Sequence, residues 1–163
     1  MVSYDVNNLA TEIFTYEFDS DTGYTPLSSV SGWLANNIGM FNNRLFTTFE
    51  VSGNYFTPTG SFQQEERSVY KQMYLYEFYT KKTRQVLRGI DSSVDFITLR
   101  EGDSTITRTN KNEIAKTYRG LANDANEELE KLVTSYNMYQ AEPVQVAGED
   151  GLYVGSGTYS YVY

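Results

Sequence analysis

Four short stretches of the chain carry residue types that perform chemistry in other proteins. The first, Gly102-Asp103-Ser104, is similar to the nucleophile block of one class of esterases. A nucleophilic serine needs a base, however, and the chain contains no histidine. Turn or capping chemistry therefore explains Asp103 and Ser104 better than nucleophilic catalysis does.

Two of the stretches are acidic. Residues 19–23 (DSDTG) resemble the start of a calcium loop, but Gly23 occupies the third acidic position and no Glu follows as the bidentate ligand. Glu127, Glu128 and Glu130 belong to a predicted helix next to Lys131, where a solvated face is the default interpretation. Nothing in the sequence places two carboxylates in one pocket. We therefore predict no metal site and no cofactor.

The fourth stretch, residues 81–84 (KKTR), is basic. It suits contact with phosphate, but the stronger interpretation is that it complements the negative C-terminal end of a helix. The chain has no Walker loop and no dinucleotide-binding fingerprint. It also has no cysteine, so thiolate catalysis is excluded together with histidine-based triads. We predict that the protein is not an enzyme; a hydrolase that uses carboxylates and a divalent metal is the remaining enzymatic alternative.

Length and hydropathy predict one soluble, unprocessed domain. A chain of 163 residues is long enough to bury a core. It lacks an apolar run of 18 residues and the pattern of a signal peptide, so no membrane association is expected.

The net charge of −8 is unevenly distributed along the chain. Residues 1–60 carry a net charge of −5, residues 61–120 a net charge of +3, and residues 121–163 a net charge of −6. This segregation suits head-to-tail contacts between copies or with a complementary partner. Ordinary solvated helix surface explains it equally well.

Apolar periodicity predicts three long helices that would position these residues. The first begins at Thr25-Pro26 and has an apolar stripe from Val30 to Phe49. The second runs from about residue 61 to residue 88, with Ser61 and Gln64 as a capping box. The third follows a capping pair at Asn110 and Glu113, and Pro143 ends it.

Extended segments are predicted between and around the helices. Residues 14–19 alternate as a strand does, residues 51–60 form a loop or short hairpin, and residues 94–108 form two short strands around a Gly-centred turn. The predicted fold is mainly α: a small bundle of about three long helices with extended β arms and a strand-like C-terminal tail. Residues 1–143 form the helical-bundle domain, with the N-terminal strand and the 94–108 arm, and residues 144–163 form an extended C-terminal arm.

The order of these parts resembles the head-to-tail connectors (adaptor or neck proteins) of tailed bacteriophages. Three stretches carry the resemblance and span about half of the chain: residues 31–39 (SGWLANNIG), the aromatic-rich helix of residues 69–89, and residues 100–104 (REGDS) leading into residues 110–121. The resemblance implies a structural virion protein at the head–tail junction, assembled in the host cytoplasm. Its copies would form a ring, commonly of twelve, beneath the portal. Another neck component, such as a β-rich tail terminator or stopper, is the alternative.

The resemblance also implies partners and partner-binding residues. The partners would be other copies of the chain, the portal protein and a neighbouring neck or tail protein, while DNA would pass through the ring without specific binding. By analogy, the C-terminal arm would dock on the portal through Leu152, Tyr153, Val154, Tyr159, Tyr161, Val162 and Tyr163. The 94–108 arm would face a neighbouring subunit or the tail through Phe96, Leu99, Arg100, Glu101, Asp103 and Ile106.

Overall fold

The computed structural model describes residues 4–88, 98–101, 104–107 and 111–141, and this part of the chain is mainly helical. Its helices are α1 (Val6–Tyr16), α2 (Leu27–Asn36), α3 (Ile38–Leu45), α4 (Gln64–Arg88) and α5 (Lys111–Gln140). Its strands are β1 (Glu50–Ser52), β2 (Tyr55–Thr57), β3 (Thr98–Glu101) and β4 (Ser104–Thr107).

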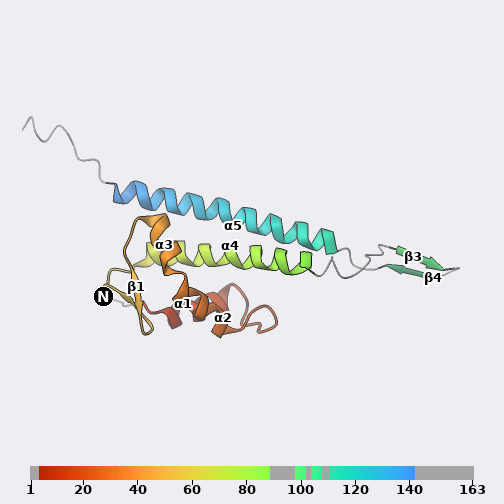
Figure 1. The fold of residues 1–163 in the computed structure, drawn as a ribbon, viewed down its shortest axis with the longest axis horizontal. Helices are drawn as coiled ribbons and strands as arrows, with labels where there is room; N and C mark the ends of the chain where they lie inside the picture. Colours follow the sequence, from red (N-terminus) through yellow and green to blue (C-terminus); the bar gives the residue numbers. More distant parts are fainter. Residues whose placement is uncertain (1–3, 89–97, 102–103, 108–110, 142–163) are drawn as a thin grey trace, which may run out of the picture.

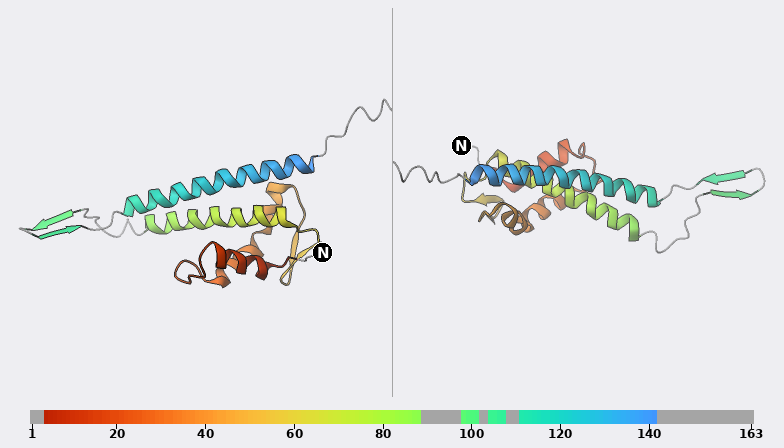
Figure 2. Two further views of the ribbon diagram at one scale, coloured as in Figure 1. Left: turned by 180° about the vertical axis from the view of Figure 1, so that it is seen from behind. Right: turned by 90° about the horizontal axis from the view of Figure 1, so that it is seen from above.

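The two long helices, α4 and α5, lie side by side and form the longest axis of the molecule (Figures 1 and 2). The short helices α1, α2 and α3 and the β1–β2 hairpin pack near the N-terminal half of α4. The β3–β4 hairpin lies at the other end of the molecule, beyond the ends of α4 and α5. The ranges of α4 and α5 agree with the second and third predicted helices, which are confirmed.

The beginning of α4 differs from the predicted capping box. The helix starts at Gln64, and the carboxylate of Glu66 accepts a hydrogen bond of 2.8 Å from the backbone N–H of Gln63. Glu65 and Glu66 occupy the first turn, where the positive end of the helix dipole favours them. Ser61 and Gln64 do not form the box; Glu66 reaches back to the chain before the helix instead.

The predicted strand at residues 14–19 is wrong. Residues up to Tyr16 belong to α1, and a turn follows. The helix is capped by Asp5, whose side chain accepts a hydrogen bond of 2.6 Å from the backbone N–H of Asn8. Its buried residues recur at helical rather than alternating spacing: Val6, Leu9, Ala10 and Ile13. Packing of this stripe overrides the short alternation at the end of the helix.

The first predicted helix is in fact two helices, α2 and α3, separated at Asn37. The side-chain amides of Asn36 and Asn37 donate hydrogen bonds of 2.7 Å and 2.8 Å to the carbonyls of Gly32 and Trp33. Such bonds to residue i−4 compete with the helical backbone bonds. The fold thus contains two long helices and three short ones among the described residues, rather than three long ones.

The core is an aromatic cluster that joins α3, the β1–β2 hairpin and α4. Phe56 and Phe62 stack with ring centroids 4.0 Å apart, and Phe41 lies 4.8 Å from Tyr70. All four side chains are fully buried, and the hydroxyl of Tyr70 donates a hydrogen bond to the carbonyl of Leu34 in α2. This cluster fixes the short elements on one half of α4.

Two antiparallel hairpins confirm the predicted extended segments between the helices. β1 pairs with β2 in the segment predicted as a loop or short hairpin, residues 51–60. The observed hairpin begins one residue earlier, at Glu50. β3 pairs with β4, with Leu99 opposite Ile106 and Glu101 opposite Ser104. This register leaves two residues between the strands, as a tight hairpin requires. The C-terminal arm, residues 144–163, lies outside the described residues.

Candidate functional site

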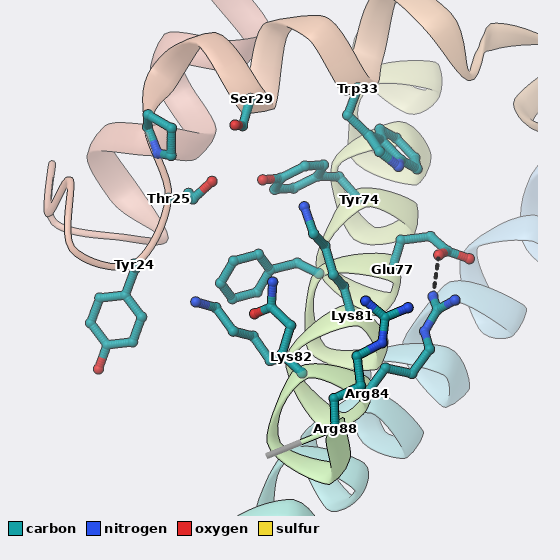
Figure 3. Close-up of a pocket in the computed structure, with 13 residues that line it drawn as sticks. Tyr24, Thr25, Ser29, Trp33, Tyr74, Glu77, Lys81, Lys82, Arg84 and Arg88 are labelled. Atoms are coloured by element: carbon teal, nitrogen blue, oxygen red, sulfur yellow. Dashed lines mark ion pairs between the residues drawn. The ribbon is translucent and has the colours of Figure 1, made fainter. Parts of the chain in front are cut away.

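A basic cleft of about 530 Å³ lies between the C-terminal half of α4 and the segment that leads into α2 (Figure 3). Its α4 wall carries the cations, and its other wall carries aromatic and hydroxyl side chains. The cleft is lined by Tyr24, Thr25, Pro26, Ser29, Trp33, Tyr74, Glu77, Phe78, Lys81, Lys82, Arg84, Gln85 and Arg88.

The cations of the basic cleft are not neutralised evenly. Arg84 forms an ion pair of 3.7 Å with Glu77, also on α4. Lys82 lies over the ring of Phe78, with its Nζ 5.4 Å from the ring centroid. Within the described part of the chain, Lys81, Lys82 and Arg88 have no carboxylate within ion-pair distance. Among the described residues, three positive charges therefore have no carboxylate partner.

Only one of these three cations, Arg88, is close enough to the C-terminal end of α4 to interact with the helix dipole. Arg88 lies in the last turn of α4, where it complements the negative end of the helix dipole. Lys81 and Lys82 lie further back, and the dipole effect falls off within one turn. The sequence-based interpretation of residues 81–84 as a helix-end feature is therefore wrong for both lysines. Figure 3 shows that they extend from α4 toward the opposite wall of the cleft.

Trp33, in the aromatic part of the basic cleft, packs against the core. Trp33 packs edge-to-face on Tyr74, with ring centroids 5.3 Å apart, and it also contacts the buried Tyr70. Burial raises the pKa of Tyr74, while a hydrogen bond with Thr25 lowers it. These contacts attach the α2 wall of the cleft to rings of α4 that belong to the core.

Glu127, Glu128 and Glu130, which were predicted to lie on a solvated helix face, are exposed on α5. We call Asp124, Glu127 and Glu128 the acidic ridge; all three are exposed, and none has an ion-pair partner among the described residues. The neighbouring Glu130 differs, because it binds Arg44 of α3 at 2.9 Å. The acidic ridge is thus a group of unpaired negative charges on the helix that α4 separates from α2 (Figure 1).

The structure brings four of the predicted arm residues into one hairpin. Leu99, Arg100 and Glu101 lie in β3, and Ile106 lies in β4. Phe96 and Asp103 lie outside the described residues, as do all seven residues predicted to dock on the portal. The predicted contacts of both arms therefore remain predictions.

Two of the stretches that resemble catalytic or metal-binding motifs lie partly or wholly within the described residues. Of Gly102-Asp103-Ser104, only Ser104 does, and it begins β4. The side chain of Asp21 accepts a hydrogen bond of 2.7 Å from the backbone N–H of Gly23, which is the bond of an Asx turn. Within residues 4–88, 98–101, 104–107 and 111–141, no group of three or more acidic side chains is arranged to hold a metal ion.

One feature of the basic cleft was missed by sequence reasoning. The lysine run was recognised, but Tyr24 and Trp33, which form the opposite wall, lie about 50 residues earlier in the chain. No local pattern joins segments so far apart. The aromatic wall becomes visible only when the core places α2 beside α4.

Comparison with family models, with curated proteins and with solved structures returns no match for this chain. Among the described helices, none combines the length and the apolar character that crossing a membrane requires.

Proposed function

We propose that this chain is a structural subunit of the neck of a tailed bacteriophage, where copies of it form a ring that joins the portal of the head to the tail. The observation that carries the proposal is the position of the β3–β4 hairpin. It lies beyond the ends of α4 and α5, far from the aromatic core around α1, α2 and α3 (Figure 1). A hairpin held at the end of two long helices is suited to contacting another subunit.

The described architecture supports an adaptor over the alternative neck components. Terminators and stoppers are expected to be rich in β structure, whereas this chain has two short hairpins among its described residues and two helices of 25 and 30 residues. The resemblance of residues 31–39, 69–89, and 100–104 leading into 110–121, to connector proteins points in the same direction. Those residues contribute to α2, α3, α4, β3, β4 and the first part of α5.

The distribution of charge is compatible with a ring that surrounds DNA. Clustered Lys and Arg on a channel wall would bind phosphates, and a net negative chain avoids such binding. The chain carries a net charge of −8.

Native mass spectrometry of the chain mixed with the portal protein of the same phage tests the proposed function. The expected result is a closed assembly that contains one portal ring and a fixed number of copies of this chain. A chain that stays monomeric in the presence of the portal, and that is absent from purified virions, would exclude the role.

A further inference from the structure

The basic cleft and the acidic ridge carry complementary charges, but they belong to different sides of one molecule. The cleft opens between α4 and the segment before α2, whereas the ridge is on α5, on the far side of α4 (Figures 1 and 3). No ion pair joins them within the described part of the chain. If these charges pair with each other, they do so between molecules.

We propose that the basic cleft of one copy binds the acidic ridge of a second copy of the same chain. Lys81, Lys82 and Arg88 would receive Asp124, Glu127 and Glu128 of the neighbour. This inference rests on the proposed function, because it names the contact that would join adjacent copies in the ring.

The spacing of the two charged groups supports this pairing. Glu127 and Glu128 lie three and four residues after Asp124, so the ridge occupies one face of α5 over about one turn. Lys81, Lys82 and Arg88 occupy two turns of α4. The acids lie within one turn of α5, whereas Arg88 lies about two turns beyond Lys81. The closest match in spacing is therefore between the adjacent lysines, Lys81 and Lys82, and the adjacent acids, Glu127 and Glu128.

The symmetry of such a contact suits a ring. The two surfaces differ, so each copy would use its cleft on one neighbour and its ridge on the other. A contact between different surfaces is heterologous, and repeated heterologous contacts close into rings when the rotation between copies allows it.

The observations favour this partner over a nucleic acid. Every copy of the chain carries the acidic ridge, whose three carboxylates have no ion-pair partner among the described residues. The aromatic wall with Trp33 and Tyr24 adds apolar contact area to the cleft, which suits a protein partner.

A charge-swap experiment on the full chain tests the proposed contact. Self-association is measured by sedimentation at low and high salt for the wild type, for K81E/K82E in the cleft and for E127K/E128K on the ridge. Each double variant is expected to weaken association at least about tenfold, which corresponds to about 1.4 kcal/mol. High salt is expected to weaken association of the wild type, since it screens the charges.

Mixing the two variants gives the decisive result. The reversed cleft of K81E/K82E matches the reversed ridge of E127K/E128K, so the mixture is expected to associate more tightly than either variant does alone. The matched control for K81E/K82E is K116E/R119E, which changes the net charge of the chain by the same amount and sign at exposed positions of α5 outside the ridge. Circular dichroism of each variant verifies that it folds.

Several results would overturn the proposed contact. They are a wild type that stays monomeric at high protein concentration in low salt, variants that associate as well as the wild type, and a mixture that does not associate. Binding of duplex DNA that K81E/K82E loses, without self-association of the wild type, would assign the cleft to nucleic acid. These experiments measure self-association of the isolated chain. The neck role is tested separately, with the portal protein and with virions, so failure of one proposal is distinguishable from failure of the other.

Discussion

The hydroxyl of Tyr136 donates a hydrogen bond of 2.6 Å to one carboxylate oxygen of Glu66, and both side chains are buried. The other carboxylate oxygen accepts the backbone N–H of Gln63 at 2.8 Å. A single acidic side chain thus closes the first turn of α4 and ties it to the C-terminal half of α5. This contact, together with the close packing of α4 on α5, keeps the two long helices in register.

Replacing Tyr136 with Phe removes the hydroxyl and leaves a buried carboxylate oxygen of Glu66 without its partner. Because hydrogen bonds to charged groups are the stronger ones, we expect Y136F to lower the free energy of unfolding by about 1.5–3 kcal/mol. Urea unfolding measures the change. The control is Y139F, since Tyr139 is 80% exposed. Equal stability of Y136F and the wild type would show that the contact contributes nothing.

Alkaline pH is expected to destabilise the fold through its buried tyrosines. Burial raises the pKa of Tyr70, and burial together with the hydrogen bond to Glu66 raises the pKa of Tyr136. An unfolded tyrosine ionises near pH 10, so above about pH 10 the unfolded chain releases protons that the folded chain retains. The free energy of unfolding therefore falls as the pH rises through this range, and the full contribution is present below it.

Unfolding curves recorded from neutral to alkaline pH test this expectation. The fall in stability is expected to be smaller in Y136F than in the wild type. Replacing the exposed Tyr16 with Phe serves as the control, because its side chain is 77% exposed. A pH dependence that is identical in all three proteins would show that Tyr136 does not contribute to the loss of stability at alkaline pH.

The sequence predicted the long helices better than the short ones. α4 and α5 extend over 25 and 30 residues, so their apolar stripes repeat many times and the signals at their ends agree with them. α1 was missed because six alternating residues at its end outweighed the capping Asp5 and the helical spacing of its buried residues. The break at Asn37 was missed because the apolar stripe continues through it; only the side-chain bonds to Gly32 and Trp33 reveal it.

The candidate site was less predictable than the fold. The lysine run and the acidic residues of α5 are visible in the sequence, but their availability depends on which of them find partners. Glu130 binds Arg44 of α3, 86 residues earlier, whereas Glu127 has no ion-pair partner among the described residues. Such long-range pairing follows from the packing of α3 against α5, which local patterns do not contain.

The side chain of Asn42 is expected to stabilise the end of α3. Its amide donates a hydrogen bond of 2.7 Å to the carbonyl of Phe49, and its oxygen accepts bonds of 3.0 Å from the backbone N–H of Phe49 and the hydroxyl of Thr47. We expect N42A to lower the free energy of unfolding by about 2 kcal/mol, since three bonds of ordinary strength are lost.

Chemical denaturation checks the effect of N42A against N43A. Asn43 is exposed, and its replacement is expected to change stability by no more than about 0.5 kcal/mol. Similar effects of the two substitutions would contradict the role assigned to Asn42.

Replacing residues 98–107 with a short Gly/Ser linker is expected to separate folding from assembly. β3 and β4 pair with each other and lie beyond the helices, so the melting temperature and helical content of the isolated chain are expected to stay close to those of the wild type. Binding to the portal or to the next neck component is expected to be lost, which pull-down from assembled particles measures. A large drop in melting temperature would instead assign the hairpin to the core.

Cryo-electron microscopy of the intact head–tail junction tests the central claim most directly. The proposed function predicts a ring of identical subunits beneath the portal, with density that fits the α4–α5 pair and places the β3–β4 hairpin against a neighbouring subunit or tail component. A junction whose density is accounted for without this chain would contradict the claim.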